Sequence, residues 1–214
     1  MAGITLVIGT KTYSSWSLRA WLPLRRLGVA FGEILIPLRQ PGSKAAILRH
    51  SPSGKVPYLE HKGVAVWESL AIGEFLAEAY PRARLWPADA AARALARAVA
   101  TEMHAGFAAL RTHMPMDLRG SYPGQGMNSE VAADIARITA IWRGCRGDQA
   151  AAGPFLFGHF TVADAMFAPV VTRFVTYEVA LDEACAAYRD AVWSMPEMQE
   201  WIAAARRETL VIGP

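Results

Sequence analysis

The pattern of the sequence changes at Pro81, and this change limits the folds open to the chain. Before Pro81, short β-rich runs alternate with amphipathic helical segments. After it, apolar residues recur at helical spacing and no segment alternates with period two for long. An order of strand, helix, strand, hairpin and helix is typical of a small mixed α/β domain. The sequence therefore predicts an α/β domain over residues 1–80, a linker with two prolines over 81–88 and an all-helical domain over 89–214.

Apolar spacing, together with Gly and Pro signals, predicts the individual elements. In the first domain we expect strands at residues 4–8, 33–38, 58–61 and 64–67, and helices at 15–27 and 69–80. In the second domain the alanine-rich segment 89–114 predicts one long helix, followed by a loop over 115–128. Further helices are expected at 129–143, 162–177, 183–191 and 197–207.

The composition excludes several classes of protein. With 53% hydrophobic and 19% charged residues, the 214-residue chain is not intrinsically disordered. Its 22 basic residues are dispersed among 19 acidic ones, so we expect neither nucleic-acid nor membrane binding. Two cysteines exclude a disulfide scaffold, and the five histidines show no metal-ligand spacing, so we expect no metal. No signal peptide or membrane span is recognisable, which predicts a cytoplasmic protein.

Hydroxyl-bearing side chains gather where the first strand is expected to turn into the first helix. Tyr13, Ser14, Ser15 and Ser17 all lie in this segment. The unpaired N–H groups and the dipole of a helix N-terminus favour an anion. A hydroxyl donor beside a bound thiol would stabilise the thiolate and lower the pKa of the thiol. The alternative is that Ser14 or Ser15 only caps the helix.

A second segment, Ser-Pro-Ser-Gly-Lys-Val-Pro at residues 51–57, stands before an expected strand. The Val56–Pro57 bond is a candidate cis peptide, which would leave the N–H and C=O of Val56 free at a sheet edge. A peptide-like ligand can pair with such free groups as an added strand. The alternative is an ordinary loop that leads into a strand.

A third polar pair, Glu68 and Ser69, lies where a strand gives way to a helix. The Ser69 hydroxyl and nearby N–H groups can hold a ligand carboxylate, and Glu68 can hold an ammonium group. The alternative is a simple helix start. The same alternative is preferred for Thr161 and Asp164, which form a variant capping box before an apolar run, so Asp164 is predicted to serve folding.

In their order and spacing these segments resemble those of the cytosolic glutathione S-transferase superfamily. Residues 51–57 look like its Asn-Pro-x-Gly-x-Val-Pro segment, Glu-Ser-Leu-Ala-Ile at 68–72 like its Glu-Ser-x-Ala-Ile segment, and Thr-Val-Ala-Asp at 161–164 like its capping box. Ser-Ser-Trp-Ser-Leu-Arg at 14–19 is similar to the zeta-class pattern Ser-Ser-Cys-x-x-Arg, here in a bacterial form of the superfamily. The resemblance covers nearly the whole chain.

The resemblance implies a thioredoxin-like N-terminal domain that binds glutathione as cosubstrate and an all-α C-terminal domain that supplies most of an electrophile pocket. Ser14 or Ser15 would hydrogen-bond the sulfur, with Tyr13 as a rival donor. Val56 would pair with the cysteinyl backbone, and Glu68 and Ser69 would hold the γ-glutamyl end. The other glutathione-binding residues implied are Trp16, Ser17, Arg19, Lys55 and Pro57.

An apolar stripe in the helical half is a candidate lining for the electrophile pocket. The stripe consists of Met103, Phe107, Leu110 and Met114, and Arg111 lies beside it. Such a stripe is usually core, but one that faces the first domain can line a substrate pocket. The resemblance further implies a small-molecule electrophile, a role in detoxification and a homodimer.

One departure from the zeta pattern is that Trp16 stands where that class has cysteine. The replacement removes a thiol and adds bulk near the sulfur, so it argues against a zeta-type isomerase. Two alternatives to a conjugating transferase stay open. One is a glutathione-dependent cis–trans isomerase of the maleylacetoacetate type, for which Arg19, Arg111 and Arg173 are candidate carboxylate-binding residues. The other is a non-catalytic, transferase-like binding or interaction module.

Overall fold

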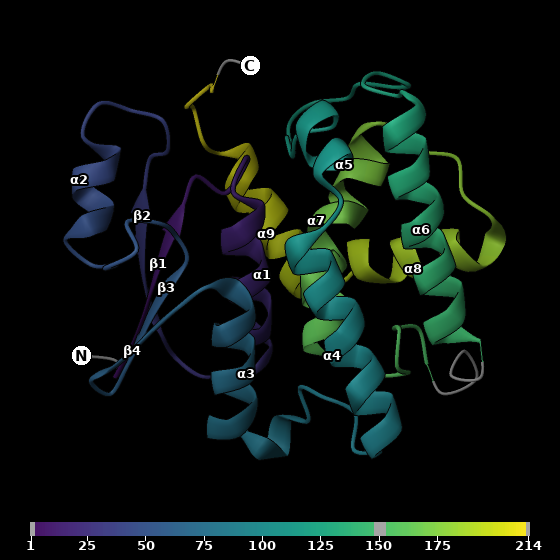
Figure 1. Cartoon of the computed structure of the whole chain (residues 1–214). Coiled ribbons are helices and arrows are strands. Elements are labelled where there is room, and N and C mark those ends of the chain that lie inside the picture. Colours follow the sequence, from purple (N-terminus) through teal and green to yellow (C-terminus); the bar gives the residue numbers. More distant parts are fainter. Residues whose placement is uncertain (1–2, 148–152, 213–214) are drawn as a thin grey trace.

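The computed structural model describes residues 3–147 and 153–212. A small sheet with its helices forms one half of the molecule and a group of helices the other, as Figure 1 shows. The predicted fold class, a thioredoxin-like α/β domain followed by an all-helical domain, is confirmed. The helices of the described ranges lack the combination of length and apolar character that crossing a membrane requires.

The sheet is mixed and has four strands: β1 (Ile4–Gly9), β2 (Gly32–Ile36), β3 (Tyr58–His61) and β4 (Val64–Trp67). Their order is β2-β1-β3-β4, with β1 parallel to β2 and antiparallel to β3, and β3 antiparallel to β4. Successive side chains of β1 point to opposite faces, so Leu6 and Ile8 join the main core while Val7 packs with Ile36 and Ile47 on the other face.

Helices α1 (Ser15–Arg26) and α3 (Ser69–Ala79) pack together against the main-core face of the sheet. Helix α2 (Ser43–Leu48) covers the other face through Ile47. The sequence analysis did not predict α2. It is only six residues long, and its N-cap is Gly42 at φ +84°, a position without a capping side chain. Too little periodicity exists in six residues to identify a helix.

The second half contains α4 (Ala90–Ala105), α5 (Ala108–His113), α6 (Ser129–Arg146), α7 (Val162–Thr176), α8 (Glu183–Trp193) and α9 (Pro196–Arg206). The linker holds a 3₁₀ turn, η1 (Pro81–Ala83).

The prediction of a single helix over 89–114 is wrong. Gly106 is extended and Phe107 is left-handed at φ +60°, so the chain breaks and restarts. The Asp134 carboxylate accepts from Leu110 N–H at 2.9 Å and thereby satisfies a free donor of the new helix.

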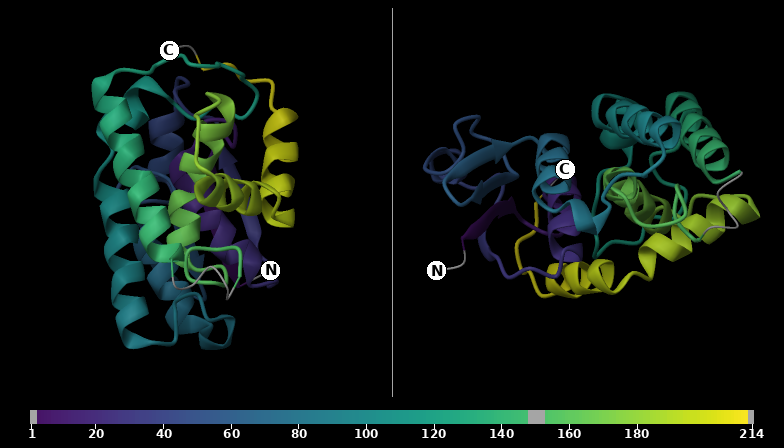
Figure 2. Two further views of the ribbon diagram at one scale, coloured as in Figure 1. Left: turned by 90° about the vertical axis from the view of Figure 1, so that its right-hand side faces the viewer. Right: turned by 90° about the horizontal axis from the view of Figure 1, so that it is seen from below.

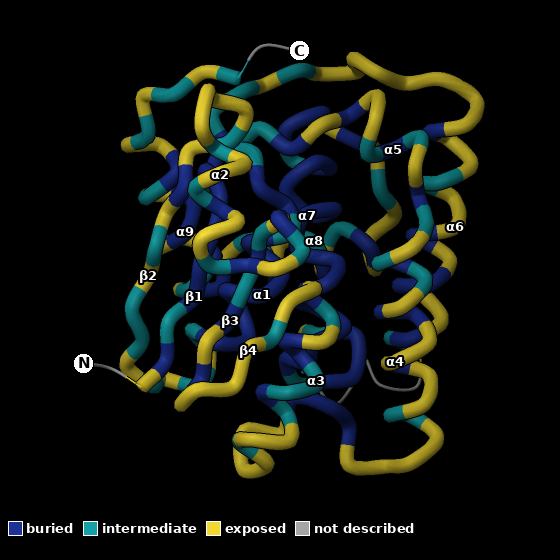
Figure 3. The backbone as a smooth tube through the Cα atoms, turned by 60° about the vertical axis from the view of Figure 1, so that its left-hand side comes forward, coloured by how far each residue is buried: buried dark blue, intermediate teal, exposed yellow. Residues whose placement is uncertain are grey.

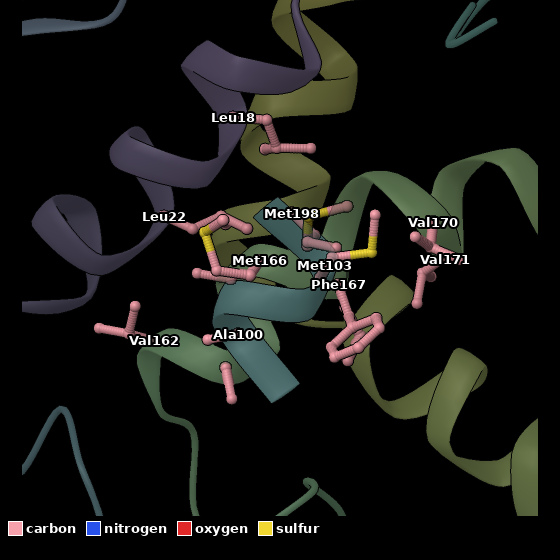
Figure 4. Close-up of a cluster of buried hydrophobic side chains, with 14 of the residues drawn as sticks. Leu18, Leu22, Ala100, Met103, Val162, Met166, Phe167, Val170, Val171 and Met198 are labelled. Atoms are coloured by element: carbon pink, nitrogen blue, oxygen red, sulfur yellow. The ribbon is translucent and has the colours of Figure 1, made fainter. Parts of the chain in front are cut away.

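Helix α7 forms the centre of the molecule and contacts α1, α4 and α8 (Figure 2). Nearly all of its residues are buried, which Figure 3 shows as a dark tube inside the exposed outer helices. Its apolar side chains meet those of α1, α4 and α9 in a shared core. Figure 4 labels Leu18, Leu22, Ala100, Met103, Val162, Met166, Phe167, Val170, Val171 and Met198 in this cluster. The core therefore joins the two halves into one folded unit.

The capping box predicted at the start of α7 is confirmed. The Asp164 carboxylate is fully buried and accepts from Leu156 N–H, Thr161 N–H, the Thr161 hydroxyl and the Tyr188 hydroxyl, at 2.8–3.1 Å. Burial raises the pKa of the Asp164 carboxyl, and these hydrogen bonds oppose the shift. Asp164 thus connects α7, α8 and the chain before α7, as the folding interpretation predicts.

Candidate functional site

The start of α1 uses two of its three serines for local structure. Ser14 is the N-cap: its Oγ accepts from Ser17 N–H at 3.3 Å and its hydroxyl donates to Ser17 Oγ at 2.7 Å. Ser17 Oγ also accepts from the N–H of Gly9 at 3.0 Å, which ties α1 to β1. The Ser15 hydroxyl makes no hydrogen bond with any described residue. Of the two predicted catalytic serines, only Ser15 therefore has a free hydroxyl.

Tyr13 is engaged elsewhere. Its hydroxyl oxygen accepts from Arg119 Nη2 at 2.8 Å, and the Arg119 guanidinium lies 5.7 Å from the centre of the Tyr13 ring. Tyr13 does not line the cleft described next. Because the Tyr13 hydroxyl is already hydrogen-bonded and the Ser15 hydroxyl is not, Ser15 is favoured over Tyr13 as the hydroxyl available to a ligand.

A cleft of about 350 Å³ lies where the three predicted segments meet. Its lining includes Trp16 from α1, the loop before β3 and Glu68 from the turn between β4 and α3. Of the predicted residues it brings together Trp16, Lys55, Val56, Pro57 and Glu68. Ser14, Ser15, Ser17, Arg19 and Ser69 are buried and do not line the cleft.

The loop before β3 leaves a backbone edge free at the cleft. The Val56–Pro57 peptide is cis, as predicted, and the N–H and C=O of Val56 make no hydrogen bond with any described residue. Lys44 Nζ donates to the carbonyl of Gly54 at 3.0 Å and holds the turn. Gly54 has φ +62°, a left-handed conformation that glycine adopts without strain, so this turn favours glycine.

Glu68 and Ser69 form the opposite wall at the start of α3. Glu68 adopts φ +70°, a left-handed conformation that is uncommon outside glycine, and its carboxylate is exposed. Ser69 is buried, and its Oγ has no hydrogen-bond partner in the described chain. A buried hydroxyl without a partner is costly unless a ligand completes it. This pair therefore fits a ligand that carries both an ammonium and a carboxylate group.

Two guanidinium groups lie close to the Trp16 side chain. Arg19 lies 4.5 Å and Arg111 lies 4.8 Å from the centre of a Trp16 ring. Arg19 donates through Nε to the carbonyl of Met166 at 2.9 Å, whereas its Nη1 and Nη2 are buried without a described partner. Burial, together with the charges of Arg111 and Arg173, holds the pKa of Arg19 well below its ordinary value. The site therefore contains a concentrated and incompletely neutralised positive charge.

Arg173 and Arg111 use their donors mainly on backbone carbonyls. Arg173 is buried and donates to the carbonyls of Met114 and Pro169 at 2.8 and 2.9 Å. Burial and the nearby Arg111 charge lower the pKa of Arg173 to about 10. Arg111 is half-buried and donates to the carbonyls of Met103, His104 and Gly106, at the end of α4.

His104 enters the cleft from α4 and was not predicted, since no motif surrounds it in the sequence. Its ring packs edge-on against Trp16 at 5.1 Å, its Nε2 lies 3.7 Å from a Glu68 carboxylate oxygen, and its Nδ1 is buried without a described partner. Burial lowers the pKa of His104, the Glu68 carboxylate opposes the shift, and Arg19 and Arg111 add to it. Ser53 is the other lining residue that the sequence did not indicate.

The predicted electrophile-binding stripe does not line this cleft. Met103, Phe107, Leu110 and Met114 are all buried in the main core. Of the predicted electrophile residues, only Arg111 reaches the Trp16 side of the site. Within the described residues, no group of three or more His, Cys, Asp and Glu side chains could hold a metal ion.

Two family models match the chain, one on each side of the linker. The model of the glutathione S-transferase N-terminal domain matches residues 13–79, and that of the C-terminal domain matches residues 88–204. Glutathione S-transferase L1 of Arabidopsis thaliana is 25% identical over 198 residues, 90% of this chain and 76% of its own length. A probable maleylacetoacetate isomerase of Caenorhabditis elegans is 26% identical over 161 residues, 73% of this chain and 72% of its own length.

Solved structures share the fold. A glutathione transferase homologue from Burkholderia gl BGR1 with bound glutathione has a TM-score of 0.73 at 23% identity, over 96% of this chain and 99% of that one. A bacterial maleyl pyruvate isomerase, a zeta-class glutathione S-transferase, has a TM-score of 0.73 at 22% identity, over 96% of this chain and 100% of that one. With a family model on either half and the same architecture in these structures, the chain belongs to the glutathione S-transferase family.

Proposed function

We propose that this protein is a glutathione transferase in which the Ser15 hydroxyl stabilises the thiolate of bound glutathione. The observation that carries the proposal is a set of unpartnered polar groups around one site: the Ser15 hydroxyl, the Val56 backbone and the Ser69 hydroxyl. Unused donors and acceptors in a folded protein are costly, and a ligand with matching groups removes that cost.

The cysteinyl backbone and the γ-glutamyl end of glutathione each have matching groups in the protein. The Val56 N–H and C=O can pair with the cysteinyl backbone as an added strand. Glu68 can bind the γ-glutamyl ammonium, while the Ser69 hydroxyl and the N-terminus of α3 can bind its carboxylate. Lys55 and Ser53 add polar groups to the cleft. In this proposal the thiol of bound glutathione lies toward the start of α1.

The chemistry requires a thiolate at neutral pH. A free thiol with pKa ~8.5 is only a few per cent ionised at pH 7, and lowering the pKa by about one to two units corresponds to about 1.4–2.7 kcal/mol. A hydroxyl donor and a helix N-terminus can supply this amount together. The thiolate then attacks an electrophilic carbon, a carbon–sulfur bond forms, and a leaving group departs with its electron pair.

The test is a pH titration of the ultraviolet thiolate absorbance of glutathione bound to the purified protein. A pKa of the bound thiol at least one unit below that of free glutathione is expected. Binding with an unshifted pKa would contradict the catalytic mechanism and favour the non-catalytic binding module. Absence of binding would remove the glutathione site altogether.

A second function, cis–trans isomerisation of an unsaturated diketo acid of the maleylacetoacetate type, is supported by the arginines. Arg19, Arg111 and Arg173 interact electrostatically with one another beside Trp16, and a substrate with carboxylates would compensate their charge. In this reaction the thiolate adds to the double bond, the new single bond rotates, and the thiolate leaves. Glutathione is thus recovered unchanged, whereas conjugation consumes it, so assaying free thiol during turnover separates the two functions.

The family's homodimer is also proposed for this chain. Large apolar side chains are exposed on β4, where Val64 is 48% and Trp67 is 43% exposed, and on α4, where Leu95 is 46% exposed. Exposed apolar groups of this size favour burial in an interface. A molar mass of twice 23.3 kDa by light scattering is expected, and a monomer at micromolar concentration would contradict the proposal.

A further inference from the structure

The loop that leads into α1 is bound by a carboxylate from the far end of the chain. Glu208 lies just beyond α9, and its Oε1 accepts from Lys11 N–H at 2.7 Å. Its Oε2 accepts from Thr12 N–H at 2.9 Å and from the Thr12 hydroxyl at 2.7 Å. Both oxygens are therefore used, and they satisfy consecutive donors of a loop that has no strand neighbour there.

Other groups of the helical half hold the same loop. Trp201 Nε1 donates to the Lys11 carbonyl at 3.1 Å, and Leu118 N–H donates to the Thr12 carbonyl at 3.3 Å. Arg119 joins the loop to the C-terminal segment, since it donates to the Tyr13 hydroxyl, to the Leu210 carbonyl and to the Glu208 carbonyl. Among these partners Glu208 is the one whose side chain binds the backbone N–H groups of Lys11 and Thr12.

We propose that Glu208 is a positioning residue that sets the orientation of the Ser15 hydroxyl, and through it the acidity of the bound thiol. Ser15 follows Thr12 by three residues and makes no side-chain hydrogen bond that would hold it in place. A hydrogen bond to a thiolate loses strength when its donor is displaced by a fraction of an ångström. This inference rests on the proposed function of the serine.

Because Glu208 is charged, the direction in which the pKa of the bound thiol changes can distinguish loss of positioning from loss of charge. A nearby negative charge disfavours a thiolate, so removing it through Glu208→Gln would by electrostatics alone lower the pKa of the bound thiol. Loss of positioning acts in the opposite direction and raises that pKa. A rise therefore cannot come from the charge, and Glu208→Asp, which keeps the charge but shortens the side chain, is expected to produce the same rise.

Glu200→Gln is the matched control. Glu200 lies on α9 and also bridges to the N-terminal half, through an exposed ion pair with Arg25 Nε at 2.8 Å, but it does not touch the loop. Removing it takes away one carboxylate and one contact between the halves, as Glu208→Gln does. Any effect that both variants share is therefore a general effect on stability rather than on the loop.

Two measurements test the proposal. Amide hydrogen exchange on the protein without ligand is expected to accelerate at least tenfold at Lys11 and Thr12 in Glu208→Gln, and to stay unchanged in Glu200→Gln. Titration of bound glutathione is expected to show the thiol pKa raised by about one unit in Glu208→Gln and Glu208→Asp, which corresponds to a loss of thiolate of about three- to eightfold at pH 7. Glutathione affinity is expected to change less than twofold.

Each of the two measurements can contradict part of the proposal. Unchanged exchange at Lys11 and Thr12 would show that Glu208 does not hold the loop. Faster exchange with an unchanged or lowered thiol pKa would refute the positioning role. If the unaltered protein leaves the pKa of bound glutathione at its free value, the proposed function fails instead, and the exchange measurement still decides whether Glu208 holds the loop.

Discussion

Helices α1 and α7 of this protein both have a hydroxyl residue at the N-cap, but they differ in how completely the polar groups at the N-terminus are hydrogen-bonded. At α7 the Thr161–Asp164 box is closed: each carboxylate oxygen of Asp164 is hydrogen-bonded within the protein. At α1 the cap Ser14 is satisfied, but the neighbouring Ser15 hydroxyl has no described partner. One turn further on, Arg19 carries two buried, unpartnered nitrogens.

The difference separates a motif that serves folding from one that is available for ligand chemistry. A network in which every buried polar group is paired stabilises the fold and leaves no free donor or acceptor for a ligand. A helix start with an unused donor and an uncompensated cation is less stable than it could be, and that deficit is expected where a ligand completes the structure. The comparison therefore predicts opposite responses to mutation at the two sites.

The largest effect is expected at α7. Asp164→Ala leaves the N–H groups of Leu156 and Thr161 and the Tyr188 hydroxyl without an acceptor, and it is expected to destabilise the protein by about 3–5 kcal/mol. Urea unfolding followed by Trp fluorescence measures the loss. Asp164→Asn, which keeps one acceptor oxygen, is expected to lose less. A loss below about 1 kcal/mol in Asp164→Ala would show that the Asp164 network contributes little to the stability of the fold.

Next in size is the effect of Ser15→Ala. The variant is expected to raise the pKa of bound glutathione by about one to two units and to lower kcat/KM at pH 7 by about 8- to 25-fold through the smaller thiolate fraction, with stability changed by less than about 0.5 kcal/mol. Thiolate titration and steady-state kinetics measure the two changes.

Ser14→Ala is the control for Ser15→Ala, because Ser14 caps the same helix one residue earlier. It is expected to cost about 1 kcal/mol of stability with a smaller change in thiol pKa. If Ser14→Ala raised the thiol pKa more than Ser15→Ala, the assignment of the catalytic hydroxyl would pass to Ser14.

Arg19→Met removes the buried and incompletely paired charge near the start of α1. Replacing a buried, incompletely paired cation by an apolar side chain of similar length is expected to stabilise the protein by about 1 kcal/mol, even though the Nε bond to Met166 is lost. Arg25→Met, at an exposed position of the same helix, controls for the effect of side-chain type. Destabilisation in Arg19→Met would show that Arg19 is as structural as Asp164.

The smallest effect concerns the proton on His104. Because the pKa of His104 is lowered in the folded protein, the unfolded chain binds the proton more readily, and stability falls as the pH drops from neutral through the ordinary histidine range. Arg19 contributes to this lowering, so Arg19→Met is expected to raise the pKa of His104 and to weaken the acid loss of stability. A nuclear magnetic resonance titration of the His104 ring measures the pKa, and an unchanged value would contradict the electrostatic coupling.

Local signals in the sequence were sufficient for most of the fold. Turn residues and alternation located β3 and β4 to the residue, and apolar periodicity located α7 and α9 to within one residue at each end. The break at Phe107 was not predictable, because Phe rarely adopts a left-handed conformation and the surrounding alanines favour a continuous helix. The acceptor that completes the new helix, Asp134, lies 24 residues away from Leu110.

The sequence was sufficient to predict which segments form the site, but not which serine hydroxyl is free or that His104 lines the cleft. The motifs predicted that Trp16, Val56 and Glu68 belong to one site, and all three line the same cleft. The choice between Ser14 and Ser15 depends on which hydroxyl the cap consumes, and that is a matter of side-chain geometry. His104 reaches the cleft only through the packing of α4 beside Trp16, a tertiary contact that leaves no local pattern in the sequence.

The packing of α1 on α7 also has a consequence for protein synthesis. The apolar face of α1 is covered by a helix that the ribosome delivers only after residues 27–161. At about 5–20 residues per second, Leu18 and Leu22 wait roughly 10 to 30 s for the partner that buries them in the finished protein. During that interval the nascent sheet domain exposes an apolar surface that molecular chaperones can bind, and the domain acquires its final core only after α7 has been synthesised.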